Sequence, residues 1–292
     1  MNWRLLASKE FGDAIRNYQL YAMAALFGLV FGVFGYIHVR NVRRARVHDY
    51  LSAPEPIEFV TMLSLLCIVL IPATGLMLSY EAIVKRRDGG QLTLVLGMPH
   101  DRRDVVIGSL VGRYLVFLAP LLLGVVVAVA ILLGFGATVP LAALAGFTLA
   151  TAGLGLAYVA IGIGLSGLLR SPSWAAVCAF GVFMLFVFVW RVVPDGVVYL
   201  LSGLEFPDEL PWWRPYVATL SPSVAYERVL DAYVFDRAGE DAPSVFGVAV
   251  LLVWVILAPL AGYLQFDRTD LSVRCTSTSG RRAPTCDRPR GP

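Results

Sequence analysis

YEAIVKRRDGGQLTLVLGMPHDRRD, residues 80–104, is the one densely charged stretch of the chain that lies between two long apolar runs. The run before it covers about residues 60–80, and the run after it covers about residues 106–134. A helix that is apolar on every side must be buried in protein or lipid, and about 20 residues at roughly 1.5 Å each cross a hydrocarbon core of roughly 30 Å. We therefore expect both runs to cross a membrane and residues 80–104 to face water.

The composition extends this expectation to the whole chain. Of 292 residues, 58% are hydrophobic and 15% are charged, and the mean hydropathy is +0.71. We predict an all-α polytopic protein of the cell membrane with six transmembrane helices. The predicted spans cover about residues 19–38, 60–80, 106–134, 141–169, 174–193 and 244–264. They form a predicted transmembrane domain of residues 19–266, and the polar residues 267–292 are predicted to be a disordered cytoplasmic tail.

An even number of spans places both ends of the chain on one side of the membrane. Arg and Lys are more frequent in the loops on that side, so the positive-inside rule predicts that both termini are cytoplasmic. One segment disagrees with this orientation, because the predicted first external loop carries Arg40, Arg43, Arg44 and Arg46. A short loop with so many arginines is expected to resist transfer across the membrane.

Residues 1–18 are predicted to form an amphipathic helix that lies in the membrane interface. Apolar side chains recur there at spacings of three and four residues, with charged side chains opposite. The predicted apolar face consists of Trp3, Leu6, Ala7, Phe11, Ala14, Ile15 and Tyr18. A solvated cytoplasmic leader is the alternative interpretation.

The longest polar segment, residues 194–243, is predicted to be an acidic external loop. Ser221, Pro222 and Ser223 favour a helix start, and apolar side chains recur after them with helical spacing. Two interpretations remain open for this segment. It is an outer lid over an exit pathway, or a solvated loop with one packed surface helix.

The predicted spans lack the residues that enzymes and ion-driven carriers use. They contain no Asp, no Glu, no His pair and no metal-binding motif, so we expect neither a catalytic site nor a metal site. Arg113 is a charge within the third predicted span, and we expect it to extend toward the cytoplasmic headgroups. GIGLSG at residues 162–167 matches the dinucleotide pattern G-x-G-x-x-G. No strand pattern precedes it, so these small residues indicate close helix packing instead.

Nucleotide binding is not expected of this chain. A phosphate-binding loop requires Gly-Lys-Ser/Thr, and neither Lys9 nor Lys85 follows a glycine. If ATP powers the protein, a separate subunit must bind it together with Mg²⁺. A nucleic-acid partner is not expected either, because the basic residues are spread among loops and do not gather on one face.

Residues 79–116, SYEAIVKRRDGGQLTLVLGMPHDRRDVVIGSLVGRYLV, resemble the cytoplasmic loop of ABC-2 type transporter permeases, most closely the NosY-like subgroup. The family pattern is an acidic residue after span two, a charged turn with glycines, a leucine-rich segment, and a proline and a basic residue before span three. The residues that match it are Glu81, Asp88, Gly89, Gly90, Leu92, Leu94, Leu96, Pro99 and Arg102. The resemblance extends to KEFGDAIRNYQL at residues 9–20 and to LSPSVAYERV at residues 220–229. The chain departs from the pattern at Ser109, where members often carry lysine.

The resemblance implies a permease subunit of an exporter that is not itself an enzyme and works as a homodimer in contact with membrane lipids. A separate ABC ATP-binding subunit would hold ATP and Mg²⁺. A short helix within residues 82–98 would dock into that subunit through exposed Leu92, Val95 and Leu96, with Gly89 and Gly90 as the turn. The basic residues expected to pair with acidic rims or lipid headgroups are Lys85, Arg86, Arg87, Arg102 and Arg103.

Two alternatives remain for the charged stretch and for the chain. The stretch is an ordinary loop that only fixes topology, or the chain is a non-transporting membrane scaffold for a partner complex. The NosY-like subgroup is associated with the maturation of a copper enzyme. His38, His48 and His100 are scattered, however, so we expect no copper pathway here.

Overall fold

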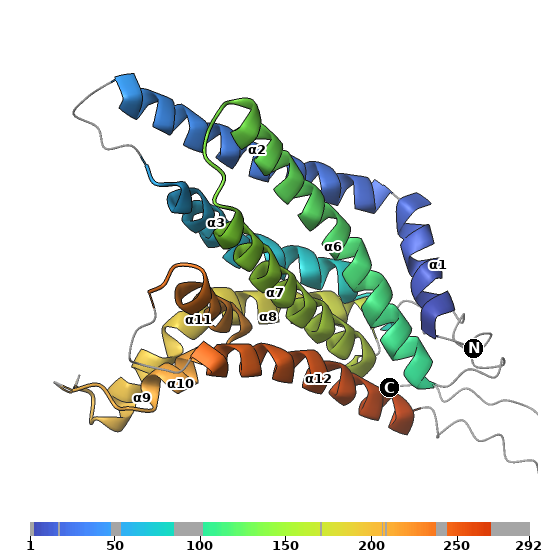
Figure 1. The fold of residues 1–292 in the computed structure, drawn as a ribbon. Coiled ribbons are helices and arrows are strands. Elements are labelled where there is room, and N and C mark those ends of the chain that lie inside the picture. The colour runs from blue at the N-terminus through green and yellow to red at the C-terminus, as the bar shows by residue number, and fades with distance from the viewer. Residues whose placement is uncertain are drawn as a thin grey trace, which may run out of the picture.

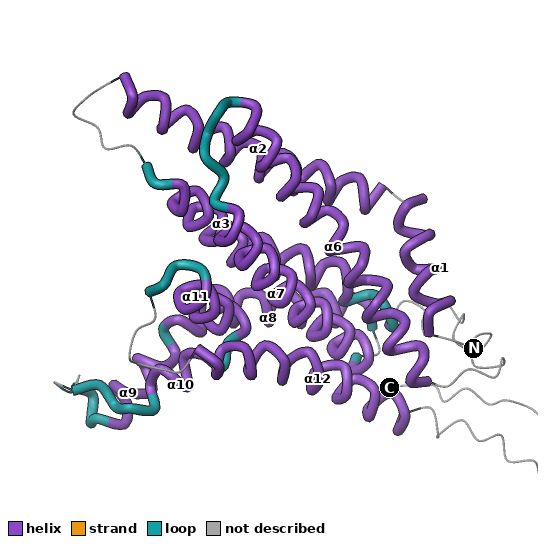
Figure 2. Tube along the Cα trace, viewed as in Figure 1, coloured by secondary structure: helices purple, strands orange, loops and turns teal. Residues whose placement is uncertain are grey.

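The computed structural model describes residues 3–16, 18–47, 54–84, 102–169, 171–205, 207, 209–237 and 244–269. For residues 3–6, 102–105 and 266–269 it describes the backbone alone. Helices account for 86% of the described residues, and no strand occurs among them. Figure 2 shows this all-helical architecture, which confirms the predicted fold class.

Within the described residues, six long, apolar helices form the body of the protein, in agreement with the predicted number of spans. They are α2 (Tyr18–Val47), α3 (Pro56–Ser79), α6 (Arg102–Gly134), α7 (Leu141–Leu168), α8 (Pro172–Val187) and α12 (Ser244–Thr269). Successive helices run in opposite directions, so the start of the preceding helix α1 (Trp3–Arg16) and the carboxyl end of α12 lie at the same end of the bundle (Figure 1). Which side of the membrane this end faces stays a prediction.

α3 and α7 are the central helices, whereas α2, α8 and α12 expose most of their apolar surface. The core between them is filled by aromatic rings, among which Phe27, Phe117 and Tyr158 are fully buried. The rings of Phe27 and Phe117 meet edge to face, with centroids 6.1 Å apart. Buried aromatic side chains therefore occupy the middle of a single bundle.

Glycines allow the central helix α7 to approach its neighbours closely. A Cβ atom added at Gly164 would overlap the carbonyl oxygen of Ala258 in α12, and one added at Gly262 would lie 2.7 Å from the carbonyl oxygen of Gly164. A Cβ atom at Gly162 would overlap the side chain of Ser79 in α3. These contacts confirm that the glycines of residues 162–167 serve helix packing.

Three helices do not end where the predicted spans or the predicted domain end, and the limits of the membrane-crossing parts stay predictions. α2 continues to Val47, so Arg40, Arg43, Arg44 and Arg46 extend the first helix and do not lie in a loop. α8 ends at Val187 and is followed by a 3-10 turn (Val189–Arg191) and α9 (Val193–Leu201), where a span to residue 193 was predicted. α12 continues to Thr269, past the predicted domain end at residue 266.

The described residues of 194–243 are not a solvated loop with one surface helix, and their role as an outer lid stays a prediction. They form α9, α10 (Arg214–Thr219) and α11 (Pro222–Tyr233), which starts at the predicted Ser221–Pro222 position. α11 packs into the bundle against α7 and α12, where Tyr226 is fully buried and lies 3.0 Å from the Thr151 hydroxyl. The hydroxyls of Tyr158 and Ser223 are 2.7 Å apart and make a second polar contact between α7 and α11.

Candidate functional site

The predicted docking loop lies mainly outside the described residues. This applies to Lys85, Arg86, Arg87, Gly89, Gly90, Leu92, Val95, Leu96 and Pro99. Arg102 and Arg103 begin α6, but only their backbone is described, and Glu81 is described in full. The docking role of these residues stays a prediction. What the structure does describe is how both ends of the loop join the bundle.

The first residues of the loop are anchored to the carboxyl end of α7. Ala82, Ile83 and Val84 are buried, and the backbone N–H groups of Ile83 and Val84 donate hydrogen bonds of 2.8 and 3.0 Å to Ser166 Oγ. Ser166 is itself fully buried. A buried N–H group without an acceptor is costly, so one hydroxyl stabilises two backbone groups. The loop start and α7 therefore move together.

Arg113 joins α6 to α3 and α1. Its Nη1 donates a 2.7 Å hydrogen bond to the carbonyl oxygen of Leu78, near the end of α3, where carbonyls lack helical partners. Its Nε lies 3.1 Å from Oε2 of Glu10 in α1. The two side chains are 22% and 9% exposed. These partners stabilise the half-buried guanidinium inside the protein, and its extension toward the headgroups stays a prediction.

α1 packs directly on α6, and Gly112 makes the close approach possible. A Cβ atom at Gly112 would lie 2.6 Å from the Cβ atom of Glu10 and 3.3 Å from the Cα atom of Ala7. The inner face of α1 includes Ala7 and Glu10, whereas Ile15 of the predicted apolar face is exposed. Residues 3–16 are therefore helical as predicted, and the location of their outer face in the membrane interface stays a prediction.

Glu81 lies beside this contact at the start of the loop. The hydroxyl of Tyr80 donates a 3.0 Å hydrogen bond to Oε1 of Glu81. Burial, and then the neighbouring carboxylate, raises the pKa of Tyr80, so its hydroxyl stays a donor at physiological pH. Glu10, Asp13, Gln19 and Arg113 line a polar hollow of about 100 Å³ between α1, α3 and α6.

We call the group of Glu10, Leu78, Glu81, Arg113 and Ser166 the loop junction. It connects the two ends of residues 80–104 to α1, α3, α6 and α7. Within the described part of the chain, no three His, Cys, Asp or Glu side chains gather as metal ligands would. The arrangement fits mechanical transmission, because a displacement of the loop would reach four helices through buried polar contacts.

Sequence reasoning missed three of the residues that build this contact region: Glu10, Gly112 and Ser166. Glu10 had a recognisable signal, because it lies three residues after Ala7 and four before Ala14 and therefore on the apolar face of α1. A carboxylate on that face and one arginine within a span are natural partners. Ser166 had no such signal, since small polar residues are common in membrane helices.

The comparisons with known proteins cover almost the whole chain. Residues 4–271 match a family described as "ABC-2 family transporter protein". The chain is 29% identical over 288 residues to "Probable ABC transporter permease protein NosY" of Stutzerimonas stutzeri, which covers 90% of this chain and 97% of that protein. It is 30% identical over 278 residues to the protein of the same name from Pseudomonas aeruginosa, which covers 88% of this chain and 92% of that protein.

Proposed function

We propose that this chain, which belongs to the ABC-2 family of transporter proteins and is a membrane permease subunit, moves its substrate with ATP hydrolysed by a separate ATP-binding subunit docked on residues 82–104. The observation that carries the proposal is the loop junction. Ser166 binds the start of the loop, and Arg113 connects α6, which follows the loop, to α3, which precedes it. A subunit that displaces this loop would move several spans at once.

The contacts of the loop junction are strong enough to transmit such a displacement. Removing one partner of a buried ion pair costs about 3–5 kcal/mol, and leaving a buried donor without an acceptor costs about 1–3 kcal/mol. The lipid-facing contacts of α2 and α8 are weaker and less specific by comparison, because lipid tails are as apolar as the side chains. We infer that α3, α6 and α7 shift as one unit when the loop moves.

We propose that the pathway forms between two copies of the permease. Phe117, Phe147 and Tyr158 fill the centre of one bundle and are fully buried, which argues against a route through it. α8 presents exposed aromatic side chains at Trp174 and Phe180, a surface that a second copy would cover. Closure of two ATP-binding subunits would then change how the two bundles pack against each other and open or close the pathway between them. Outward transport is proposed from the resemblance to ABC-2 exporters.

Co-purification tests the docking step. The chain is co-expressed with the candidate ATP-binding subunit of the same genome, and Leu92→Asp is combined with Leu96→Asp. We expect the double variant to lose the ATP-binding subunit, because two charges cannot enter an apolar groove without a large desolvation cost. The matched control replaces Leu204 and Leu210 with Asp, since both are exposed and belong to the segment between α9 and α10, which lies at the other end of the bundle (Figure 1). A wild-type chain that retains no ATPase, or a double variant that retains it fully, contradicts the proposal.

A second measurement separates transport from scaffolding. The complex is reconstituted in vesicles, and its ATPase rate is measured with wild-type permease and with Ser166→Ala, which weakens the anchor of the loop. If the chain is a transporter, the variant complex should move less substrate for each ATP that it hydrolyses than the wild-type complex does. A scaffold would hold the ATPase at an unchanged rate and move no compound in either case.

A further inference from the structure

The first membrane helix is longer than a membrane requires. α2 has 30 residues and is therefore roughly 45 Å long, whereas a hydrocarbon core is roughly 30 Å thick. Its apolar part begins at Tyr18, so the last turns, which carry Arg40, Arg43, Arg44 and Arg46, extend past the hydrocarbon. They lie at the end of the bundle opposite the loop junction (Figure 1). Neither the packing of the bundle nor the proposed transport accounts for this basic extension.

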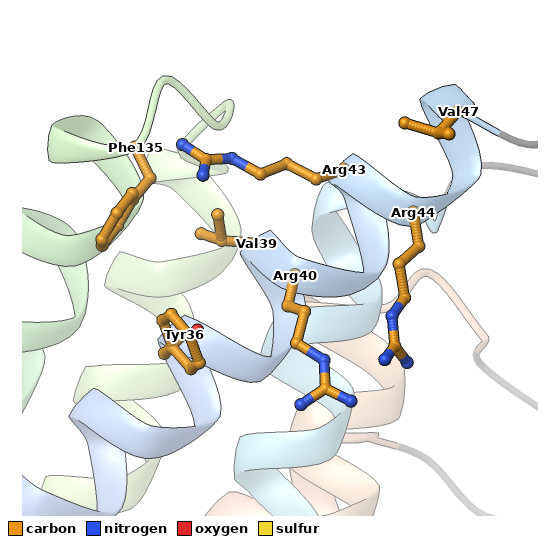
Figure 3. A pocket seen from close by; sticks show the side chains of 7 residues that line it. All are labelled: Tyr36, Val39, Arg40, Arg43, Arg44, Val47 and Phe135. Carbon is orange, nitrogen blue, oxygen red and sulfur yellow. The ribbon is translucent and has the colours of Figure 1, made fainter.

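Three of these arginines border a hollow at the membrane boundary. Arg40, Arg43 and Arg44 line a space of about 260 Å³, together with Tyr36 and with Phe135, which follows α6 (Figure 3). The guanidinium of Arg43 lies over the ring of Phe135, 5.0 Å from its centroid. The side chains of Arg40 and Arg44 leave the helix one turn apart and extend in the same direction (Figure 3).

Among the described residues, positive charge gathers around this hollow without a paired carboxylate. None of the carboxylates that the structure describes pairs with Arg40, Arg43 or Arg44. Like charges four residues apart destabilise a helix, so Arg40 and Arg44 are better tolerated with an anion between them. Guanidinium groups bind phosphate oxygens through paired N–H donors, which makes a phosphate the best-fitting anion.

The exposed face of α2 that precedes the hollow in the sequence indicates that the phosphate belongs to a lipid. Leu29, Val33 and Tyr36 are exposed on α2 and recur at spacings of four and three residues, with Arg40 four residues further on. These side chains form an apolar stripe that faces lipid and leads to the arginines. An acyl chain along the stripe would bring its headgroup to the depth of the hollow. A soluble phosphate or an acidic protein segment would make no contact with this apolar stripe.

We propose that Arg40 and Arg44, with Arg43 against Phe135 at the edge of the same hollow, hold the phosphate of an anionic phospholipid in the leaflet at the end of the bundle opposite the loop junction. Tyr36 and Phe135 border the glycerol region, and the stripe from Leu29 to Tyr36 contacts an acyl chain. The bound lipid offsets part of the positive charge of the basic extension, which helps to accommodate a run of arginines on the side predicted to be external. The proposal does not depend on the docking of an ATP-binding subunit.

Lipid titration of the purified, delipidated full-length chain tests the proposal. Phosphatidylglycerol and phosphatidylcholine are added in detergent, and bound lipid is counted by native mass spectrometry. We expect the wild-type chain to prefer phosphatidylglycerol and R40Q/R44Q to bind it about tenfold more weakly, because two charges near a headgroup are lost. The matched control is R46Q/R237Q, which removes the same charge from arginines that do not line the hollow. Arg43→Gln is the second variant if R40Q/R44Q does not fold, and it should also weaken binding.

Several outcomes would overturn the proposal. Equal binding of the two lipids by the wild-type chain excludes a headgroup site, and an equal loss in R46Q/R237Q shows only diffuse attraction between charges. Displacement of phosphatidylglycerol by millimolar inorganic phosphate would assign the hollow to a soluble anion. Retention of an acidic protein by the wild-type chain but not by R40Q/R44Q, without any lipid preference, would assign it to a protein partner.

Discussion

The guanidinium of Arg113 in α6 pairs with the carboxylate of Glu10 in α1, with Nε 3.1 Å from Oε2. Residue 10 precedes the first span, and residue 113 lies within the third. The same guanidinium donates to the Leu78 carbonyl at the end of α3. One half-buried side chain thus contacts three helices around the point where residues 80–104 leave and rejoin the bundle.

The first prediction concerns this pair. Arg113→Gln is expected to lower the free energy of unfolding by about 3 kcal/mol, because Glu10 loses its buried cationic partner. E10Q/R113Q should recover part of that loss, since no carboxylate then stays buried without the arginine. Chemical unfolding of the purified chain in detergent measures both values.

The more exposed pair of Arg191 and Glu227 provides the control for that measurement. Arg191→Gln is expected to cost less than about 1 kcal/mol, as for other ion pairs near a surface. If the effects of Glu10→Gln and Arg113→Gln simply add, the two residues do not interact and the described pair has no energetic role.

The membrane spans could be predicted because a helix that crosses the hydrocarbon core must consist mainly of apolar residues, which a hydropathy profile detects. α7 runs from Leu141 to Leu168, within one residue of its predicted bounds, since Pro140 and Arg170 mark its ends in the sequence. For the same reason the first predicted span stops at residue 38, where the apolar part of α2 ends. Arginine is a good helix former, so the helix continues to Val47 although its hydropathy falls after Val39.

The features that could not be predicted depend on contacts between residues that are distant in the sequence. The helical pattern after Ser221 predicted α11, but its burial depends on partners in α7, Thr151 and Tyr158, that are distant in the sequence. The end of α8 at Val187 had no signal, because apolar residues continue through Val189 and Trp190. In the loop junction, Glu81 was singled out by the resemblance to ABC-2 permeases for a docking role that stays a prediction, whereas Ser166 became visible only in the fold.

The second prediction concerns the loop anchor. Ser166→Ala leaves the buried N–H groups of Ile83 and Val84 without their acceptor, so we expect a loss of about 2 kcal/mol in unfolding free energy. Ser79→Ala is the matched control, because Ser79 is equally buried but its hydroxyl donates to carbonyls of its own helix, Gly75 and Leu76. It should cost clearly less. Equal effects of the two substitutions would mean that Ser166 does not anchor the loop.

The third prediction concerns the contact between α7 and α12. Gly164→Ala introduces a Cβ atom where the Ala258 carbonyl already lies, so the helices must separate at a cost of about 1–3 kcal/mol. Gly153→Ala on the same helix meets no atom within 4 Å and should be neutral or stabilising, because alanine favours helix more than glycine does. Thermal unfolding in detergent distinguishes them. Similar melting temperatures for the two variants would contradict the close approach.

The fourth prediction concerns orientation in the membrane. Asp13 of α1 and Asp236, which follows α11, are exposed at opposite ends of the bundle. The excess of Arg and Lys on the side of the termini predicts that Asp13 is cytoplasmic and Asp236 external. In a chain with Cys275→Ser and Cys286→Ser, a membrane-impermeant maleimide should therefore label Asp236→Cys on intact cells.

The companion variant Asp13→Cys should react only after the cells are permeabilised, and the background chain should stay unlabelled, because Cys67 is buried and Cys178 lies within α8. Labelling of Asp13→Cys on intact cells, with Asp236→Cys protected, would reverse the orientation. The basic extension of α2 would then face the cytoplasm, and the loop that precedes α6 could not meet a cytoplasmic ATP-binding subunit. The same experiment therefore tests the topology on which the proposed docking depends.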